Sequence, residues 1–404
     1  MRRHALLATL ATGLLALTAT AQPPKPLPLK LPEGVTPESL TDPKEATRVA
    51  EWLEKEHPAP RSEATRMLIA ILRGSALTGV DGWFGPAESR FSWAWLAERQ
   101  GLDAKTQAIP RDKFTGSPAL FDALDRDGDG KLTPNDLDWS DRNPYVMQAN
   151  VLNRVFRRID TGGDGKLTRD ELDAFFKLVA GDKDGFTADD FRRAMIPRGP
   201  AGFSPGDGPT LPMLVKGLFS SELGSLQEGP KPGDAAPDFT LKTIDGKETV
   251  QLSKLIGPKP VMLVLGNFTC GPFRGLYPDV DAVYRRYKDQ ATFVMVYVRE
   301  AHPTDGWKME SNTRVGVSAK QPTTYDERVG VCEQFRKMVK PGMPVLVDDI
   351  NDPVGNAYSG MPARLYVIDP KGKVAYKSGR GPFGFKPGEM EQALVMSLLE
   401  ASAK

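Results

Sequence analysis

The spacing of the hydrophobic positions changes about half-way along this chain. Before about residue 196, apolar residues recur at helical intervals, as over 42–56 and 62–73, and stretches rich in Gly and Asp separate them. After about residue 230, short apolar runs typical of buried strands alternate with longer helical stretches. Because strands that alternate with helices indicate an α/β layer, the pattern predicts a helical half followed by an α/β half.

Individual elements can be placed along the second half. Strands are expected at 239–241, 261–265, 292–298, 344–347 and 364–368, with helices at 277–289 and 325–340. A stretch rich in Pro and Gly over 197–212 predicts a linker ahead of this half. The expected organisation is a signal peptide (1–21), a Pro-rich tether (22–41), a helical domain (42–196), a linker (197–228) and an α/β domain (229–404).

The N-terminus has the pattern of a secretory signal. Arg2 and Arg3 are followed by a mostly apolar run over 5–17, and Ala19 to Ala21 supply small residues for cleavage. The apolar run is shorter than a typical membrane span. We therefore expect a protein exported to the periplasm or beyond the cell, with no membrane span after cleavage; the alternative is an uncleaved anchor.

Composition narrows the function classes. The chain has 404 residues, 40% hydrophobic and 26% charged, which is typical of a globular protein of more than one domain. A net charge of +1 gives no reason to expect nucleic acid as a partner. Cys270 and Cys332 are the only cysteines, so the chain is not a disulfide scaffold, although the two could form one bridge, structural or catalytic.

Two segments of the helical half have the spacing of twelve-residue calcium loops. In the first metal loop, 125–136, the expected ligands are Asp125, Asp127, Asp129, the Lys131 carbonyl, Thr133 and Asp136, with Gly130 at the turn. In the second metal loop, 160–171, they are Asp160, Asp164, the Lys166 carbonyl, Thr168 and Glu171. The first loop ends in Asp rather than Glu, and the second has Gly162 in place of a carboxylate, so each departs once from the full pattern.

These loops make residues 80–195 resemble the EF-hand family. The resemblance implies one or two Ca²⁺ sites, with Leu132 and Leu167 paired across a short β bridge. Degenerate copies of the loop at 102–113 and 182–191 are expected to contribute packing only. The alternative is that the Asp/Gly-rich turns cap helices without metal.

Candidate redox chemistry lies in the α/β half. Cys270 follows the apolar run 260–265 directly and precedes Gly271, Pro272 and a predicted helix. A thiol attacks as its thiolate, and a helix N-terminus lowers a thiol pKa. Thioredoxin-like folds place their reactive thiol at such a junction. Phe273 stands where a CGPC motif has its second cysteine, so the site has one thiol.

Four segments, 267–274, 297–307, 364–368 and 379–385, together resemble the iodothyronine deiodinase family in sequence and order. The string EAHPTDGW, which begins at Glu300, is the most specific of them. The resemblance implies a thioredoxin-like fold with Cys270 where the family has its catalytic selenocysteine. It places Thr269, Glu300 and His302 at matching motif positions, and Arg380 and Tyr297 in segments expected to contact substrate.

The residue types suggest roles within this site. His302 is the only histidine of the α/β half and is expected to act as acid and base, with Glu300 orienting it. Thr269 and nearby backbone N–H groups are expected to polarise the leaving atom. Pro362 precedes a strand and is expected to be a cis-proline beside the thiol. Cys332 lies on a predicted helix, where a core role is favoured over a resolving thiol.

The sequence thus favours a thiol oxidoreductase in which Cys270 attacks iodine of an aryl iodide or peroxide oxygen and an external thiol regenerates it. No organic cofactor is implied. One alternative is a peroxiredoxin-like peroxidase, although Asn267 stands where that family usually has Thr. The other is a non-catalytic calcium-binding adaptor, which predicts an unreactive Cys270 with a pKa near or above about 8.5.

Overall fold

The computed structural model describes residues 30–59, 61–74, 86–140, 143–162, 165–195, 208–219, 222–223 and 228–402. The predicted signal peptide, part of the predicted tether and Asp164 of the second metal loop lie outside these residues. Within them, no helix combines the length and the apolar character that a membrane span needs.

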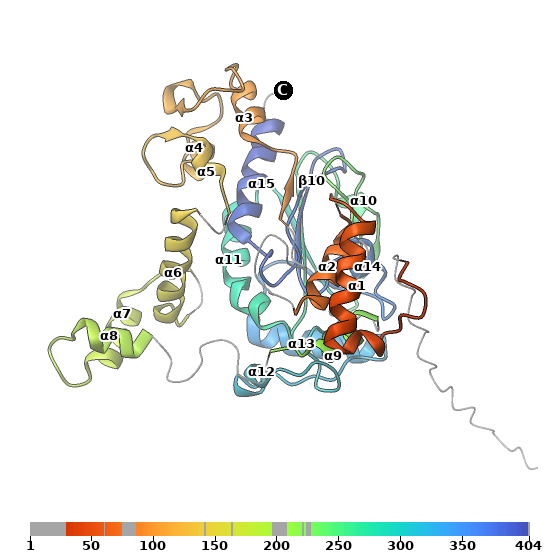
Figure 1. The fold of residues 1–404 in the computed structure, drawn as a ribbon. Helices are drawn as coiled ribbons and strands as arrows, with labels where there is room; N and C mark the ends of the chain where they lie inside the picture. The colour runs from red at the N-terminus through yellow and green to blue at the C-terminus, as the bar shows by residue number, and fades with distance from the viewer. Residues whose placement is uncertain are drawn as a thin grey trace, which may run out of the picture.

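A mixed β-sheet organises the α/β half (Figure 1). Its strand order is β1-β10-β9-β6-β7-β8-β4-β5 among the described residues. The strands are β1 (Glu88–Ser89), β4 (Thr240–Thr243), β5 (Thr249–Gln251), β6 (Val261–Gly266), β7 (Thr292–Tyr297), β8 (Val345–Val347), β9 (Arg364–Ile368) and β10 (Val374–Lys377). Strands β6, β7 and β8 run parallel, whereas β9 is antiparallel to β6. All five strands expected from the sequence are present, and the sheet has the thioredoxin-like α/β arrangement.

Helices cover both sides of this sheet. They are α10 (Leu252–Leu255), α11 (Gly271–Tyr287), α12 (Glu310–Arg314), α13 (Tyr325–Val339), α14 (Pro353–Ala357) and α15 (Pro387–Ala401). Helix α11 packs beside α15, which also contacts β9 and β10, and α13 contacts β8. The β6–α11–β7 crossover places the first residue of α11 at the carboxyl end of β6, where α/β folds commonly bind ligands.

The metal-loop part consists of short elements. They are α3 (Trp93–Arg99), β2 (Ile109–Pro110), a 3₁₀ turn (Arg111–Lys113), α4 (Pro118–Leu124), β3 (Lys131–Leu132), α5 (Pro134–Leu137), α6 (Pro144–Ile159), α7 (Arg169–Ala180) and α8 (Ala188–Met195). Leu132 pairs with Ile109 across the β2–β3 bridge. The prediction that Leu132 pairs with Leu167 is therefore wrong. The first metal loop takes its partner from the degenerate copy that precedes it, 102–113, and not from the second metal loop.

The metal-loop part docks on the C-terminal helix. The Trp139 indole N–H donates to Gln392 Oε1 at 2.8 Å, and Lys386 Nζ donates to the Trp139 carbonyl at 2.9 Å. The indole ring lies where a side chain at Gly388 would begin, so only glycine fits there. Helix α4 also packs against α15, as Figure 1 shows at the upper left.

A second hydrophobic core lies in what we call the helical unit: α1 (Pro43–Glu56), α2 (Glu63–Leu72) and α9 (Leu211–Phe219), preceded by a 3₁₀ turn (Ser39–Thr41). Asp42 and Ser62 cap α1 and α2 by accepting backbone N–H bonds. Helix α9 falls within the stretch 197–228 that the sequence predicts as linker. The first two helices thus pack with α9 in one core, separate from the metal-loop helices, while the predicted domain boundaries stay a prediction.

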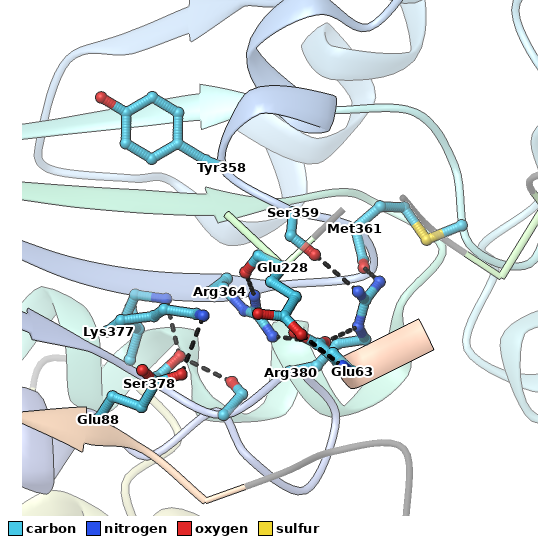
Figure 2. Close-up of polar contacts among 12 residues, drawn as sticks. Glu63, Glu88, Glu228, Tyr358, Ser359, Met361, Arg364, Lys377, Ser378 and Arg380 are labelled. Atoms are coloured by element: carbon cyan, nitrogen blue, oxygen red, sulfur yellow. Dashed lines mark hydrogen bonds and ion pairs between the residues drawn. The ribbon is translucent and has the colours of Figure 1, made fainter. Parts of the chain in front are cut away.

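A cluster of buried charges joins the helical unit to the sheet (Figure 2). Glu63 Oε1, on α2, accepts from Arg380 Nε at 2.7 Å and from an Arg364 terminal nitrogen at 2.9 Å. Nearby, Lys377 pairs with Glu88 at 3.1 Å. All three basic side chains are buried, and buried charges need such partners to offset the loss of hydration. The Glu63 contacts therefore tie α2 to β9 and to the segment that follows β10.

We expect Glu63→Gln to lower the free energy of unfolding at pH 7 by about 3–5 kcal/mol, because two buried guanidinium groups lose their counter-charge. Burial alone would raise the pKa of Glu63, but the charges of Arg380 and Arg364 outweigh it and lower the pKa to about 2. A depressed carboxyl pKa gives stability that is present above the unfolded-state value, about 4.3, and is lost as the pH falls through the folded-state value.

The gap between wild type and Glu63→Gln in urea unfolding should thus close as the pH falls from about 4.3 to about 2. Glu54→Gln is the matched control, because Glu54 pairs with Arg73 at the surface of the same helical unit. It should cost about 1 kcal/mol or less. A gap that stays constant with pH would contradict the assignment.

Candidate active site

Cys270 lies at the junction of β6 and α11. It occupies the N-cap position of α11, and its side chain is buried, with 1% of the residue exposed. The Gly-Pro pair that follows it occupies the first helical turn, where proline's fixed φ is tolerated and its missing N–H costs nothing. The predicted position of the thiol, between a buried strand and a helix N-terminus, is confirmed.

The side-chain amide of Asn267 holds this junction together. Its Oδ1 accepts the backbone N–H of Cys270 at 3.0 Å and that of Ala301 at 3.3 Å. Its Nδ2 donates to the Pro362 carbonyl at 2.9 Å. One amide thus links the thiol segment, the segment after β7 and the Met361–Pro362 turn, whose peptide bond is cis as expected.

These three segments surround a cavity, which we call the Cys270 cavity. Its wall is formed by Glu222, Leu223, Cys270, Pro272, Ala301, His302, Trp307, Met309, Met361, Pro362, Gly381, Pro382 and Phe383. Apart from Glu222, His302 and the thiol, the side chains are apolar. Cavities of this type bind small molecules through apolar contact and use a few polar groups for orientation.

His302 enters this cavity in a fixed orientation. Its backbone N–H donates to Thr269 Oγ1 at 2.9 Å, and its Nδ1 lies 3.2 Å from the Trp307 carbonyl oxygen. The Trp307 ring meets the imidazole edge-on at 4.6 Å between ring centres. A carbonyl oxygen only accepts, so this contact places the Nδ1 proton of the neutral imidazole toward Trp307 and makes Nε2 the basic nitrogen.

Burial dominates the ionisation of Cys270. Loss of hydration, together with the nearby Glu300 carboxylate, raises the pKa of this thiol to about 11. The Phe273 backbone N–H and the Arg274 charge act in the opposite direction. The thiol is therefore neutral at pH 7, contrary to the expectation that the helix N-terminus would favour a thiolate.

The first metal loop brings carboxylates together. Ligand oxygens of Asp125, Asp127 and Asp136 lie within 4.8 Å of one another. Oδ1 of Asp125 is buried and has no hydrogen-bond partner in the described residues. Asp129 is 3.3 Å from Lys131 Nζ, and Thr133 donates to Asp136 from both its N–H and its hydroxyl. An unpartnered buried carboxylate oxygen among hard oxygen ligands is the chemistry that Ca²⁺ satisfies.

The second metal loop is closed by Glu171. Its carboxylate accepts from the Thr168 N–H at 2.9 Å and from the Gly162 N–H at 2.8 Å, and these bonds lower its pKa to about 2. Asp160 accepts the Gly165 N–H at 2.9 Å. The predicted ligand Asp164 lies outside the described residues, and the Lys166 carbonyl is a predicted ligand that these contacts do not test.

Comparison with known proteins agrees with both resemblances found in the sequence, the EF-hand one and the deiodinase one. Residues 212–397 match the family model for iodothyronine deiodinase, and residues 118–195 match the model for an EF-hand domain pair. The C-terminal domain is deiodinase-like. Type I iodothyronine deiodinase of Xenopus laevis is 27% identical over 168 residues, which cover 42% of this chain and 62% of that protein. Thyroxine 5-deiodinase of Gallus gallus is 31% identical over 159 residues, covering 39% and 60% respectively.

The chain therefore spans only about three fifths of these curated relatives. Among solved structures, the pneumococcal exposed lipoprotein thioredoxin Etrx1 of Streptococcus pneumoniae shares 21% identity, covering 39% of this chain and 98% of its own, with a TM-score of 0.28. A thioredoxin-family thiol:disulfide interchange protein of Chlorobium tepidum shares 17% identity, covering 42% and 97%, with a TM-score of 0.29.

Within the deiodinase-like domain, Glu300 has different partners from those expected. Its carboxylate accepts from the Tyr297 hydroxyl and from the Thr269 backbone N–H at 2.8 Å, and its backbone exchanges hydrogen bonds with Gln321. His302 instead takes its orientation from the Trp307 carbonyl. Burial raises the pKa of Glu300 despite these donors. Glu300 therefore fixes the backbone next to Cys270 and does not orient the imidazole.

Other predicted site residues divide into two groups. Pro362 lines the Cys270 cavity with Cys270 and His302, as expected. Thr269, Tyr297 and Arg380 are buried and are not among its lining residues. The Thr269 hydroxyl and N–H are both engaged inside the protein, so they are not directed at a leaving atom.

Cys332 is a free cysteine that is fully buried on α13. Its membership of the main hydrophobic core agrees with the favoured structural role. The resolving role stays a prediction.

Sequence reasoning missed several residues that shape the site. Arg274, one helical turn after Cys270, donates to the Phe268 carbonyl and to Asn312 Oδ1 at 2.8 Å, while Asn312 donates to the Thr269 carbonyl at 2.7 Å. The four-residue spacing from Cys270 was a usable signal for Arg274. Glu222 and Leu223 also line the cavity, although the sequence predicts a linker there and no local sequence pattern indicates a site residue.

Alkylation of Cys270 tests its ionisation. In a Cys332→Ala background, we expect the rate of reaction with iodoacetamide to keep rising above pH 8.5, because burial holds the thiol pKa near 11. Removing the charge with Arg274→Gln should raise the apparent pKa further, because the guanidinium stabilises the thiolate. A rate that levels off at or below about pH 8.5 would contradict this account.

Proposed function

We propose that this protein is a deiodinase-like thiol oxidoreductase whose Cys270 reduces an iodinated aromatic ring bound in the Cys270 cavity. The observation that carries the proposal is the meeting of Cys270 and His302 in one apolar cavity, within the segment matched to iodothyronine deiodinase. The apolar walls favour an aromatic ring over a small peroxide, although peroxide remains a substrate to be assayed beside it.

The reaction balances with an external thiol as reductant. The Cys270 sulfur attacks iodine, the carbon–iodine bond breaks, and the ring carbon takes the thiol proton, which leaves a sulfenyl iodide on Cys270. One external thiol displaces iodide and forms a mixed disulfide, and a second releases Cys270 as the thiol. The net change is reduction of the aryl iodide to arene and iodide, with oxidation of two thiols to a disulfide.

His302 supplies the proton transfer that the raised thiol pKa makes necessary. Its Nε2 is the basic nitrogen, and it shares the cavity with Cys270. In this proposal it accepts the thiol proton as sulfur attacks and returns it to the ring carbon. The Phe273 N–H and the Arg274 charge stabilise the developing thiolate.

Ca²⁺ binding and export are further parts of the proposal. Asp125, Asp127 and Asp136 would hold the ion in the first metal loop, where it would satisfy the unpartnered Asp125 oxygen. The pattern of residues 2–21 supports export.

One observation favours a second candidate, a non-catalytic calcium-binding adaptor. The raised pKa of Cys270 is what that interpretation predicts. The two candidates differ in whether His302 activates the thiol when a ligand fills the cavity, which an assay can decide.

Turnover separates the two candidates. We expect the wild type to release iodide from iodinated phenols with a dithiol reductant. Cys270→Ser should abolish the release, and His302→Gln should slow it by about 10²-fold, as loss of a general acid–base does. Cys332→Ala, a buried core residue outside the cavity, is the control and should retain activity. No iodide release or peroxide reduction by the wild type at any pH would leave the adaptor as the better account.

Calcium titration tests the metal loops. We expect calorimetry of the mature protein to show one or two binding events. Asp125→Asn should remove the event of the first metal loop, because that oxygen lacks any other partner. Asp184→Asn, in the degenerate copy 182–191, is the matched control and should leave the heats unchanged. Absence of heat at millimolar Ca²⁺ would refute the metal sites.

A further inference from the structure

The helical unit reaches the Cys270 cavity directly. Glu222 and Leu223 line the cavity, and their backbone N–H groups donate to the Gly217 carbonyl of α9 at 2.7 and 3.1 Å. A side chain at Gly217 would press on Leu223, so glycine lets the chain turn back here. Trp307 lines the same cavity and packs against the core of the helical unit. One wall of the cavity is therefore built on helices that the deiodinase match, which starts at residue 212, covers only in part.

The same unit also contacts, through Glu63, a residue that adjoins two further lining segments of the cavity. Its carboxylate binds Arg380, whose other nitrogens donate to the Met361 carbonyl at 3.1 Å and to Ser359 Oγ at 2.6 Å (Figure 2). Met361 and the following Pro362 line the cavity. Directly after Arg380, the segment 381–383 lines it as well. Arg380 thus binds one lining segment through its guanidinium and directly precedes the other in the chain, and Glu63 fixes that guanidinium.

We propose that Glu63 is a positioning residue for the Cys270 cavity, acting through Arg380 on the Met361–Pro362 turn and the 381–383 segment. The proposal rests on the proposed function for its kinetic consequence, but the shape of the cavity can be measured without turnover. Glu63 touches neither substrate nor thiol. Its effect is on the width and rigidity of the cavity that an aromatic substrate must enter.

Charge explains why this position needs a carboxylate. Arg364 and Arg380 are buried side by side on Glu63 Oε1, each with less than 3% of its surface exposed. With an amide in its place, two positive groups would face each other without a counter-charge in a medium of low dielectric. Arg380 would then move toward solvent and release Ser359 and the Met361 carbonyl. Glu63→Asp keeps the negative charge but carries it on a side chain that is shorter by one methylene group.

The test compares two reagents of different size on Cys270. Wild type, Glu63→Gln, Glu63→Asp and the surface control Glu54→Gln are each alkylated with iodoacetamide and with N-phenylmaleimide in a Cys332→Ala background. We expect Glu63→Gln to change the ratio of the two rates by about fivefold or more, because small displacements of a wall alter the fit of a bulky group strongly. Glu63→Asp should restore most of the wild-type ratio, and Glu54→Gln should match wild type. For iodide release, Glu63→Gln should raise KM more than it lowers kcat.

An unchanged ratio in folded Glu63→Gln would overturn the proposal. Thermal unfolding confirms that each variant is folded at the assay temperature. If Glu63→Gln does not fold, Ser359→Ala carries the same test, because it removes an Arg380 contact without unpairing a charge, and an unchanged ratio there would overturn the proposal. A wild type without turnover whose rate ratio still depends on Glu63 would refute the proposed function and leave the positioning role standing.

Discussion

The Asn267 amide is the interaction on which the site depends. It is the point where the end of β6, the segment after β7 and the cis-proline turn before β9 share one side chain. Each of these segments follows or precedes a different strand. Hydrogen bonds between the strands do not by themselves fix the positions of these segments relative to one another. A buried amide with both of its ends engaged fixes their relative positions, since an unsatisfied donor or acceptor here would cost about 1–3 kcal/mol. The Cys270 cavity exists because these three segments meet around it.

Burial at this meeting point sets the chemistry of the thiol. A rise from the free-thiol pKa of about 8.5 to about 11 corresponds to about 3 kcal/mol against the thiolate. A helix N-terminus contributes about 0.3–1 kcal/mol in favour of an anion, and up to about 2 in buried geometries. Burial therefore outweighs the helix terminus, and the position of Cys270 before α11 does not by itself make a nucleophile. Activation has to come from a base inside the cavity, which gives the orientation of His302 by Trp307 its significance.

The sequence predicted what depends on neighbouring residues. Strands β6, β7 and β9 are continuous apolar runs and the metal loops are fixed spacings, so each could be predicted locally. Several of the errors concern the partners of a residue, and most of these partners are distant in sequence. Leu132 pairs with Ile109, Glu300 binds Tyr297 and Thr269, and Arg380 binds Glu63 more than 300 residues away. Residue type and spacing show that a carboxylate or a guanidinium is present, but not which of several charged groups will share its buried site.

The contact between the metal-loop part and the C-terminal helix α15 also joins residues that are distant in sequence. Arg126, the second residue of the first metal loop, lies over the rings of Trp139 and Tyr145 at 5.0 and 4.7 Å and donates to the Asp138 and Asn135 carbonyls. Trp139 in turn receives the Lys386 ammonium on its carbonyl and seats its ring at Gly388. Lys386 follows the 381–383 segment of the cavity wall by three residues. The metal-loop part thus contacts the chain three residues beyond the cavity wall, whereas Glu63 of the helical unit binds Arg380 directly beside that wall. A thioredoxin-like sheet supplies the thiol and the imidazole, while segments outside that sheet determine the shape of the space in front of them.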